Sequence, residues 1–138
     1  MIRTFLDSGV LIAATRASGE RGIRALALFN DAERVFVTSD FVRIEILPKA
    51  LYYKRRAEVA FYERFFSTAA QVVQYSDSLI MQAYTEACTV GLSAMDAFHI
   101  AAARMSGAEE FITTERPTSP LFRVTGITMT TLHTVPEC

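Results

Sequence analysis

Cysteine, long apolar runs and net charge are all scarce in this sequence. The two cysteines, Cys88 and Cys138, do not form the CxxC spacing that is typical of zinc and redox sites. No apolar run reaches the roughly 18 residues that a membrane-spanning helix needs, and Asp7 interrupts the first apolar run before a signal-peptide core can form. We therefore expect a cytoplasmic protein with reduced thiols and no membrane partner.

The charges nearly cancel, since 14 basic and 15 acidic side chains give a net charge of −1. This balance excludes a protein-wide positive field, so any nucleic-acid contact would use a local patch.

The six glycines never form the GxGxxG pattern of a nucleotide-binding Rossmann module. Gly9 stands two residues after Asp7, where a haloacid-dehalogenase-like phosphatase needs a second aspartate, and the paired acids of a receiver domain are missing as well.

The chain is instead rich in apolar residues, which make up 51% of its 138 residues and give a mean hydropathy of +0.22. A chain of this size buries roughly two thirds of its unfolded surface, so one compact domain over residues 1–138 is expected. Short β-branched runs alternate with longer helical patterns. This alternation predicts an α/β fold, a three-layer α/β/α sandwich with a central parallel sheet.

The expected strands cover residues 2–6, 34–38, 71–75, 110–113 and 127–131, and the expected helices cover residues 10–14, 20–29, 41–47, 54–70, 76–89 and 94–105. Ser39 is a favourable cap for a helix that starts at Asp40. Pro48 lacks a backbone donor and is expected to kink or end this helix near Leu47. Gly91 is expected to stop a later helix.

Four acids are expected at one edge of the sheet, where the carboxyl ends of parallel strands meet. Asp7 follows the first strand, Glu45 lies two turns into the helix after the second, and Glu115 comes two residues after the fourth. Asp96 begins the helix that leads back into the fourth strand. Four carboxylates at one place raise one another's pKa values unless cations neutralise them, and oxygen donors suit Mg²⁺ or Mn²⁺.

Each acid also has a structural interpretation. Asp7 is a favoured cap for the next helix, and SAMD, which ends at Asp96, matches a capping box. Glu45 is enclosed by apolar neighbours in VRIEILP, so a structural role there needs a partner. Glu115 alone is typical of a polar turn. Only the conjunction of the four predicts a metal site.

The segments FLDSGVLIAA, FVRIEIL, SAMDAFHIAAA and FITTE have the order and spacing found in small PIN-domain ribonucleases. The chain resembles this family over nearly its whole length, and in particular the VapC-type toxins of bacterial toxin and antitoxin pairs. The resemblance implies the PIN α/β/α sandwich. It also implies that Asp7, Glu45, Asp96 and Glu115 are the metal-binding and catalytic acids.

The activity implied by the resemblance is that of a Mg²⁺- or Mn²⁺-dependent endoribonuclease, with RNA, a cognate antitoxin and a second copy of the chain as partners. Asp7 and Asp96 would be the principal ligands, Glu45 a ligand or general base, and Glu115 a direct or water-mediated ligand. Two positions depart from the family, which often has Asn or Ser in place of Gly9 and more often Asp in place of Glu115. These departures keep open an alternative, a PIN-like module that binds RNA or protein without turnover.

Neighbouring polar residues would support the acids. Ser8, Thr113 and Thr114 would orient the ligands or the scissile phosphate. His99 lies one helical turn after Asp96, and we expect it to pack near this edge and hydrogen-bond a neighbour rather than to bind metal or act as an acid.

A local basic patch lies in the stretch KALYYKRRAEVAFYERF. Its cations stand among tyrosines, a mixture suited to RNA phosphates and stacked bases; they are Lys49, Lys54, Arg55 and Arg56. The alternative is a solvated helix face in which glutamates balance part of the charge. Three rings of the same region are assigned to the core or to a subunit or antitoxin groove; they are Phe61, Phe65 and Phe66.

Overall fold

The computed structural model describes residues 1–134 and contains one five-stranded sheet. The strands are β1 (Ile2–Leu6), β2 (Arg34–Ser39), β3 (Gln71–Val73), β4 (Glu110–Thr113) and β5 (Thr128–Thr131). They lie in the order β3-β2-β1-β4-β5, and every neighbouring pair is parallel. The predicted central parallel sheet is therefore confirmed.

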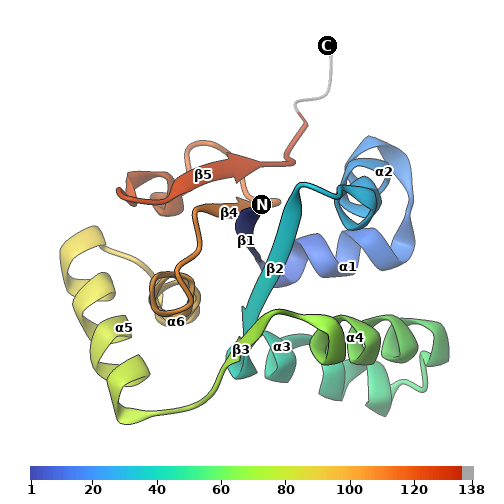
Figure 1. Cartoon of the computed structure of the whole chain (residues 1–138), viewed down its shortest axis with the longest axis horizontal. Coiled ribbons are helices and arrows are strands. Elements are labelled where there is room, and N and C mark those ends of the chain that lie inside the picture. Colours follow the sequence, from blue (N-terminus) through green and yellow to red (C-terminus); the bar gives the residue numbers. More distant parts are fainter. Residues whose placement is uncertain (135–138) are drawn as a thin grey trace.

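Helices cover both faces of this sheet. They are α1 (Ser8–Arg16), α2 (Gly19–Ala27), α3 (Asp40–Tyr52), α4 (Arg56–Thr68), α5 (Asp77–Val90) and α6 (Ala94–Met105), with short 3₁₀ turns η1 (Leu28–Asn30) and η2 (Pro120–Arg123). In Figure 1, α5 and α6 lie on one side of the sheet and α1, α2 and α4 on the other. This arrangement is the expected three-layer sandwich. Phe5 and Phe111, stacked with ring centroids 5.4 Å apart, fill the centre of the sheet.

Side-chain caps and a left-handed glycine fix several helix ends, as the sequence indicates. Ser39 Oγ accepts a hydrogen bond from the Val42 amide at 3.3 Å, and Ser76 does the same for Leu79 at 3.1 Å. Gly91 ends α5 with φ of +75°, a conformation that costs glycine little.

Of the two effects expected of Pro48, a kink or an end of its helix near Leu47, the end is wrong. Helix α3 continues through the proline to Tyr52. The missing amide removes a single helical hydrogen bond, whereas Ile46 and Ala50 are both buried on the same side of α3, before and after the proline. Packing of this face outweighs the lost bond and carries the helix one and a half turns further.

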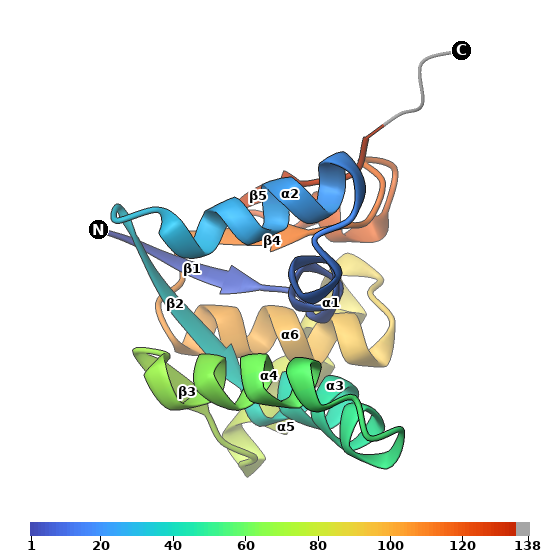
Figure 2. The same cartoon turned by 90° about the vertical axis from the view of Figure 1, so that its right-hand side faces the viewer.

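The order of the strands reverses at β1, because β2 and β3 lie on one side of it and β4 on the other. The Asp7 amide, directly after β1, donates to the Ile112 carbonyl of β4 at 2.9 Å. In Figure 2, β1 points to the edge of the sheet at which α1 begins. Such a reversal opens a crevice beyond the carboxyl ends of the two central strands.

No helix within residues 1–134 combines the length and the apolar composition that crossing a membrane requires.

Candidate active site

Asp7 directly follows β1 at the carboxyl end of the sheet, beside β4, and is buried, with 9% of its surface exposed. Its Oδ1 accepts from the Ser8 amide at 2.8 Å, which makes it the N-cap of α1. Its Oδ2 accepts from the Thr113 hydroxyl at 2.9 Å. Burial raises the pKa of Asp7 in spite of these two bonds and the nearby His99. Asp7 thus caps a helix, as one interpretation of the sequence has it, and also presents a poorly compensated charge at the crevice.

The residues after β4 connect this carboxylate to Glu115. The Thr113 hydroxyl, which donates to Asp7, accepts from the Glu115 amide at 3.1 Å. The Glu115 carboxylate in turn accepts from the Ser119 hydroxyl in the turn before η2. One threonine therefore fixes Asp7 and the backbone of Glu115 relative to each other.

Asp96 stands in the first turn of α6. Ser93 precedes this helix as its N-cap residue, but its side chain accepts no bond from the helix backbone, so the expected capping box is not formed. Burial, followed by the charges of Glu115 and Asp7, raises the pKa of Asp96 to about 6. The effect of these two charges places all three carboxyl groups within electrostatic reach of one another.

Glu45 reaches the same edge from α3 and is held by two donors. The Ser8 hydroxyl donates to Glu45 Oε1 at 2.6 Å, and His99 Nε2 lies 2.5 Å from the same oxygen. Burial opposes the charge of Glu45, but the bonds from His99 and Ser8 outweigh it and lower its pKa. Glu45 is less enclosed than VRIEILP suggests, because its side chain is 33% exposed and Ile44 faces solvent.

His99 lies between Glu45 and Asp7 and connects these two acids. It is only 2% exposed, and its Nε2 lies 4.0 Å from Asp7 Oδ1 as well as against Glu45. Burial alone would lower its pKa, but the bond to Glu45 and the charges of Asp7, Glu45 and Asp96 raise it. The expectation that His99 hydrogen-bonds a neighbour is confirmed. The sequence did not identify this neighbour as Glu45. The position of His99, one helical turn after Asp96, did indicate that it lies close to the acids.

The donor atoms of this edge suit a hard divalent cation. Its acids offer oxygen ligands, and the raised pKa values of Asp7 and Asp96 mark negative charge that the chain itself leaves uncompensated. Over residues 1–134, however, no three His, Cys, Asp or Glu side chains already stand in an arrangement that could hold a metal ion. The set fits by chemistry and charge, and binding would require some of its side chains to turn.

Gly9 and Thr114 are complementary in shape. A Cβ atom added to Gly9 would lie 2.5 Å from Thr114 Oγ1. The threonine hydroxyl therefore occupies the space into which a larger residue at position 9 would extend. This packing gives a steric reason for glycine at position 9.

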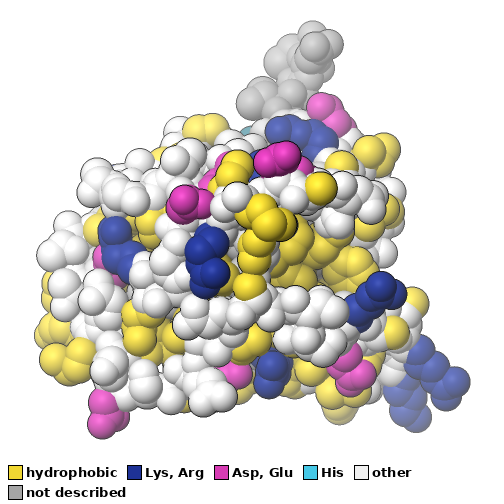
Figure 3. Space-filling view, in the orientation of Figure 1, with side chains coloured by type: hydrophobic (Ala, Val, Ile, Leu, Met, Phe, Trp, Pro, Cys, Tyr) yellow, Lys and Arg dark blue, Asp and Glu magenta, His cyan; other side chains and the backbone are white. Residues whose placement is uncertain are grey.

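The four predicted RNA-binding cations separate into two pairs. Lys49 and Arg55 line a cavity of about 170 Å³ together with Glu45. Lys54 and Arg56 line a different cavity, of about 300 Å³, with Glu63 and none of the four acids. The turn between α3 and α4 projects at the lower right of Figure 3, where Lys and Arg side chains stand out from the surface.

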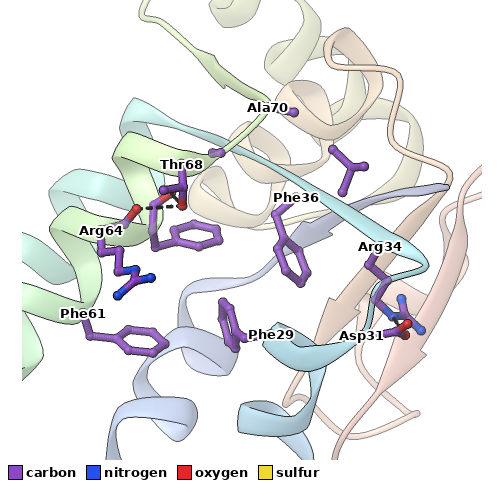
Figure 4. A pocket seen from close by; sticks show the side chains of 11 residues that line it. Phe29, Asp31, Arg34, Phe36, Phe61, Arg64, Thr68 and Ala70 are labelled. Atoms are coloured by element: carbon purple, nitrogen blue, oxygen red, sulfur yellow. Dashed lines mark hydrogen bonds and ion pairs between the residues drawn. The ribbon is translucent and has the colours of Figure 1, made fainter.

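A cavity of about 630 Å³ lies away from the acids, between η1, β2 and α4. Figure 4 shows the rings of Phe29, Phe36 and Phe61 turned toward one another in it, with Arg34 and Arg64 at its margins. In Figure 3 hydrophobic side chains gather in the hollow between α2 and α4. Of the three rings assigned to core or groove, Phe65 and Phe66 are buried and Phe61 is half-buried.

Comparisons with known proteins agree with this geometry. The model of the PIN domain family matches residues 4–116. VapC20 from Mycobacterium tuberculosis, described as a sarcin-ricin loop cleaving toxin, is 25% identical, with a TM-score of 0.63 over 78% of this chain and 86% of that one. No curated protein matches the sequence.

Two toxin-antitoxin structures share the fold at lower identity. VapBC2 from Rickettsia felis, bound to a promoter DNA fragment, is 14% identical, with a TM-score of 0.68 over 94% of this chain and 98% of that one. DNA-bound VapBC from Salmonella typhimurium is 20% identical, with a TM-score of 0.64 over 96% and 99%.

Proposed function

Because this chain belongs to the PIN domain family, we propose that residues 1–138 form a single PIN-like domain that acts as a metal-dependent endoribonuclease, the toxin of a toxin-antitoxin pair. The observation that carries this proposal is the mutual repulsion of Asp7, Asp96 and Glu115 at the switch point of the sheet. Folding gains little from like charges that are close together and buried or partly buried, so their presence here is best explained by a cation that they bind.

Asp7 and Asp96 would be the principal ligands of Mg²⁺ or Mn²⁺, with Glu115 as a direct or water-mediated ligand. The chemistry that such an ion supplies when bound is activation of a water molecule and compensation of charge on the phosphate and its leaving oxygen. Glu45 is the proposed ligand or general base. Its two hydrogen bonds, from Ser8 and His99, favour the ionised form, which is the form both roles need.

The remaining side chains position these acids. Thr113 holds Asp7 and the Glu115 amide, while His99 and Ser8 hold Glu45 and leave its second oxygen without a side-chain partner among residues 1–134. Thr114, beside Gly9, is the hydroxyl best placed to meet a phosphate at the mouth of the crevice. We assign these four residues to positioning rather than to chemistry.

A cognate antitoxin is the proposed protein partner. Support comes from the similar folds of the VapBC complexes, and from the cavity between η1, β2 and α4, where Phe29, Phe36 and Phe61 offer apolar surface to a protein segment. A homodimer remains a further proposal, for which exposed apolar side chains on α3 and α5 are available; they are Ile44, Leu51, Tyr52, Ile80, Met81 and Tyr84.

The alternative function is a PIN-like module that binds RNA without cutting it. Gly9, Glu115 and the need for side chains to turn before a metal could bind favour this alternative.

Titration of Mg²⁺ and Mn²⁺ against a labelled single-stranded RNA separates the two functions. We expect cleavage that requires the ion, stops with a chelator and is lost in Asp96→Asn. Asp77→Asn is the matched control, because Asp77 occupies the first turn of α5 as Asp96 does that of α6 but is exposed. RNA affinity without ion-dependent cutting would establish the binding module instead.

A further inference from the structure

Three cavities that share lining residues lie in succession beside Glu45, Gly9 and Glu115, and we refer to them together as the groove. The first, of about 170 Å³, contains Glu45 and Lys49. The second, of about 320 Å³, contains Gly9 and shares Arg16 with the first. The third, of about 610 Å³, contains Glu115 and shares Arg21 and Thr114 with the second. The groove therefore extends from α3 past the start of α1 to the turn before η2, and Glu45 and Glu115 are the two acids that line it.

Cations line this groove on both sides of the acids. Lys49 and Arg55 stand near Glu45, Arg16 and Arg21 stand in the middle, and Arg116 stands beside Glu115. Within the described part of the chain, Arg16, Arg21 and Lys49 form no ion pair.

Three arginines outside the groove are already neutralised by the chain. Arg34, Arg43 and Arg104 each pair with a carboxylate. The one pair in the groove, Arg55 with Glu58 at 3.8 Å, is largely exposed on the arginine side and therefore weak. Among residues 1–134, the one side-chain hydrogen bond of Arg16 and Arg21 joins Arg21 to His133 Nδ1, at 3.2 Å. Their charge is available to an external anion.

We propose that this groove binds the sugar-phosphate backbone of single-stranded RNA, with Arg16 and Arg21 as its main phosphate-binding residues. The inference rests on the proposed function, because the acids mark where the strand would be cut. Carboxylates alone would repel RNA, so a substrate needs cations near the site to hold the phosphates next to the scissile one. Arg16 and Arg21 meet this need from the end of α1 and the start of α2.

The proposal also removes two residues from the predicted basic patch. Lys54 and Arg56 line a cavity that shares no lining residue with the groove. They serve as a matched control, because Lys54→Ala with Arg56→Ala removes two exposed positive charges, and Arg16→Ala with Arg21→Ala removes two as well.

Fluorescence anisotropy with a labelled single-stranded RNA, measured in chelator at several salt concentrations, tests the proposal without cleavage. We expect R16A/R21A to weaken binding about tenfold or more and to reduce the slope of log affinity against log salt by about 1.4, since each phosphate contact contributes about 0.7 for a single strand. R16K/R21K should retain most of the slope. K54A/R56A should leave affinity and slope close to those of the parent protein, and thermal unfolding confirms that each variant is folded.

Equal weakening by the two Ala pairs, or unchanged binding by R16A/R21A, would overturn the groove. Binding of an acidic peptide that depends on Arg16 and Arg21, with RNA binding unaffected, would also overturn it and indicate a protein ligand. The cleavage assay tells the two proposals apart. A parent protein that cuts RNA while R16A/R21A binds and cuts equally well refutes only the groove, whereas arginine-dependent binding without any cutting refutes only the nuclease.

Discussion

Acidic side chains at the two ends of the parallel sheet have different kinds of partner. At the amino end, the Arg34 guanidinium pairs with Asp31 at 2.9 Å and also with Glu110. The Arg3 amide donates to Glu109 at 3.0 Å. At the carboxyl end, the four acids receive only hydroxyl, amide and imidazole partners, and within residues 1–134 no lysine or arginine forms an ion pair with them.

The pKa values of Asp31 and Asp96 illustrate this difference, whereas the pKa of Glu45 at the carboxyl end is lowered by the bonds from His99 and Ser8. The Glu33 amide and Arg34 hold the pKa of Asp31 below its ordinary value, whereas burial and like charges raise the pKa of Asp96 to about 6. A carboxylate that serves the fold is matched to a cation supplied by the chain. Carboxylates left with repulsive neighbours are better explained by a cation that arrives from solution, which is why the carboxyl end carries the proposed site.

The most direct test of this difference between the two ends is to neutralise one acid at the carboxyl end. Asp7→Asn and Asp96→Asn should each reduce cleavage by more than the roughly 10–100-fold typical of an outer partner of a metal ligand. In metal-free buffer at neutral pH, D96N should be as stable as the parent protein or more stable, because repulsion is relieved. Rates with saturating Mn²⁺ and thermal unfolding in chelator measure the two effects. A large loss of stability with normal cleavage would make these acids structural.

Removing the His99 imidazole, which lies next to both Glu45 and Asp7, should have the next largest effect. His99→Ala should lower Mn²⁺ affinity by about 10–100-fold, because Glu45 loses the donor that orients it. His99→Gln places an amide donor close to the position of Nε2 and should recover much of that affinity. Calorimetric Mn²⁺ titration of both variants, checked for folding, makes the comparison. Equal affinity in H99A and H99Q would reduce His99 to a packing residue.

At the amino end, the corresponding change should affect stability and not activity. Arg34→Ala leaves Glu110 without its cation, and we expect a loss of about 1–3 kcal/mol in the free energy of unfolding. Cleavage and its metal dependence should remain unchanged, because Arg34 stands at the opposite end of β2 from the crevice. Urea unfolding together with the cleavage assay decides this, and a selective loss of activity would contradict the division between the two ends.

The smallest expected effect is a pH dependence of stability in the metal-free protein. The pKa of Asp96 rises from 3.8 to about 6 on folding, so its stabilising contribution is complete below 3.8 and is lost as pH rises through 6. Asp7 acts in the same direction. After allowance for solvent screening, we expect a decline on the order of 1 kcal/mol between these pH values. It should be reduced in D96N or with saturating Mg²⁺, and a slope that neither change affects would rule Asp96 out as its source.

Much of this arrangement is predictable from local pattern. The bounds of β1 and β4 and the position of Asp7 directly after β1 follow from β-branched runs that end at a polar residue. The gathering of acids at one edge follows from the rule for open parallel sheets. Pro48 was misjudged because burial of Ile46 and Ala50, a property of the assembled core, overrides the local preference of proline.

The parts that could not be predicted depend on contacts between distant segments. The bond from His99 to Glu45 joins α6 to α3 across 54 positions of sequence. The separation of Lys54 and Arg56 from Lys49 and Arg55 depends on how the turn between α3 and α4 directs neighbouring side chains. No periodicity or spacing within one segment reports either fact.

The close fit of Gly9 against Thr114 has a consequence for anyone who re-engineers this protein. In a mutational scan that varies one position at a time, the result at residue 9 depends on whether the Thr114 hydroxyl can turn away, since an added Cβ would lie 2.5 Å from Thr114 Oγ1. The two positions should therefore be varied as a pair in any library, with alanine or glycine at 114 whenever a larger residue is introduced at 9. Tolerance would then be read from the combination and not from either site alone.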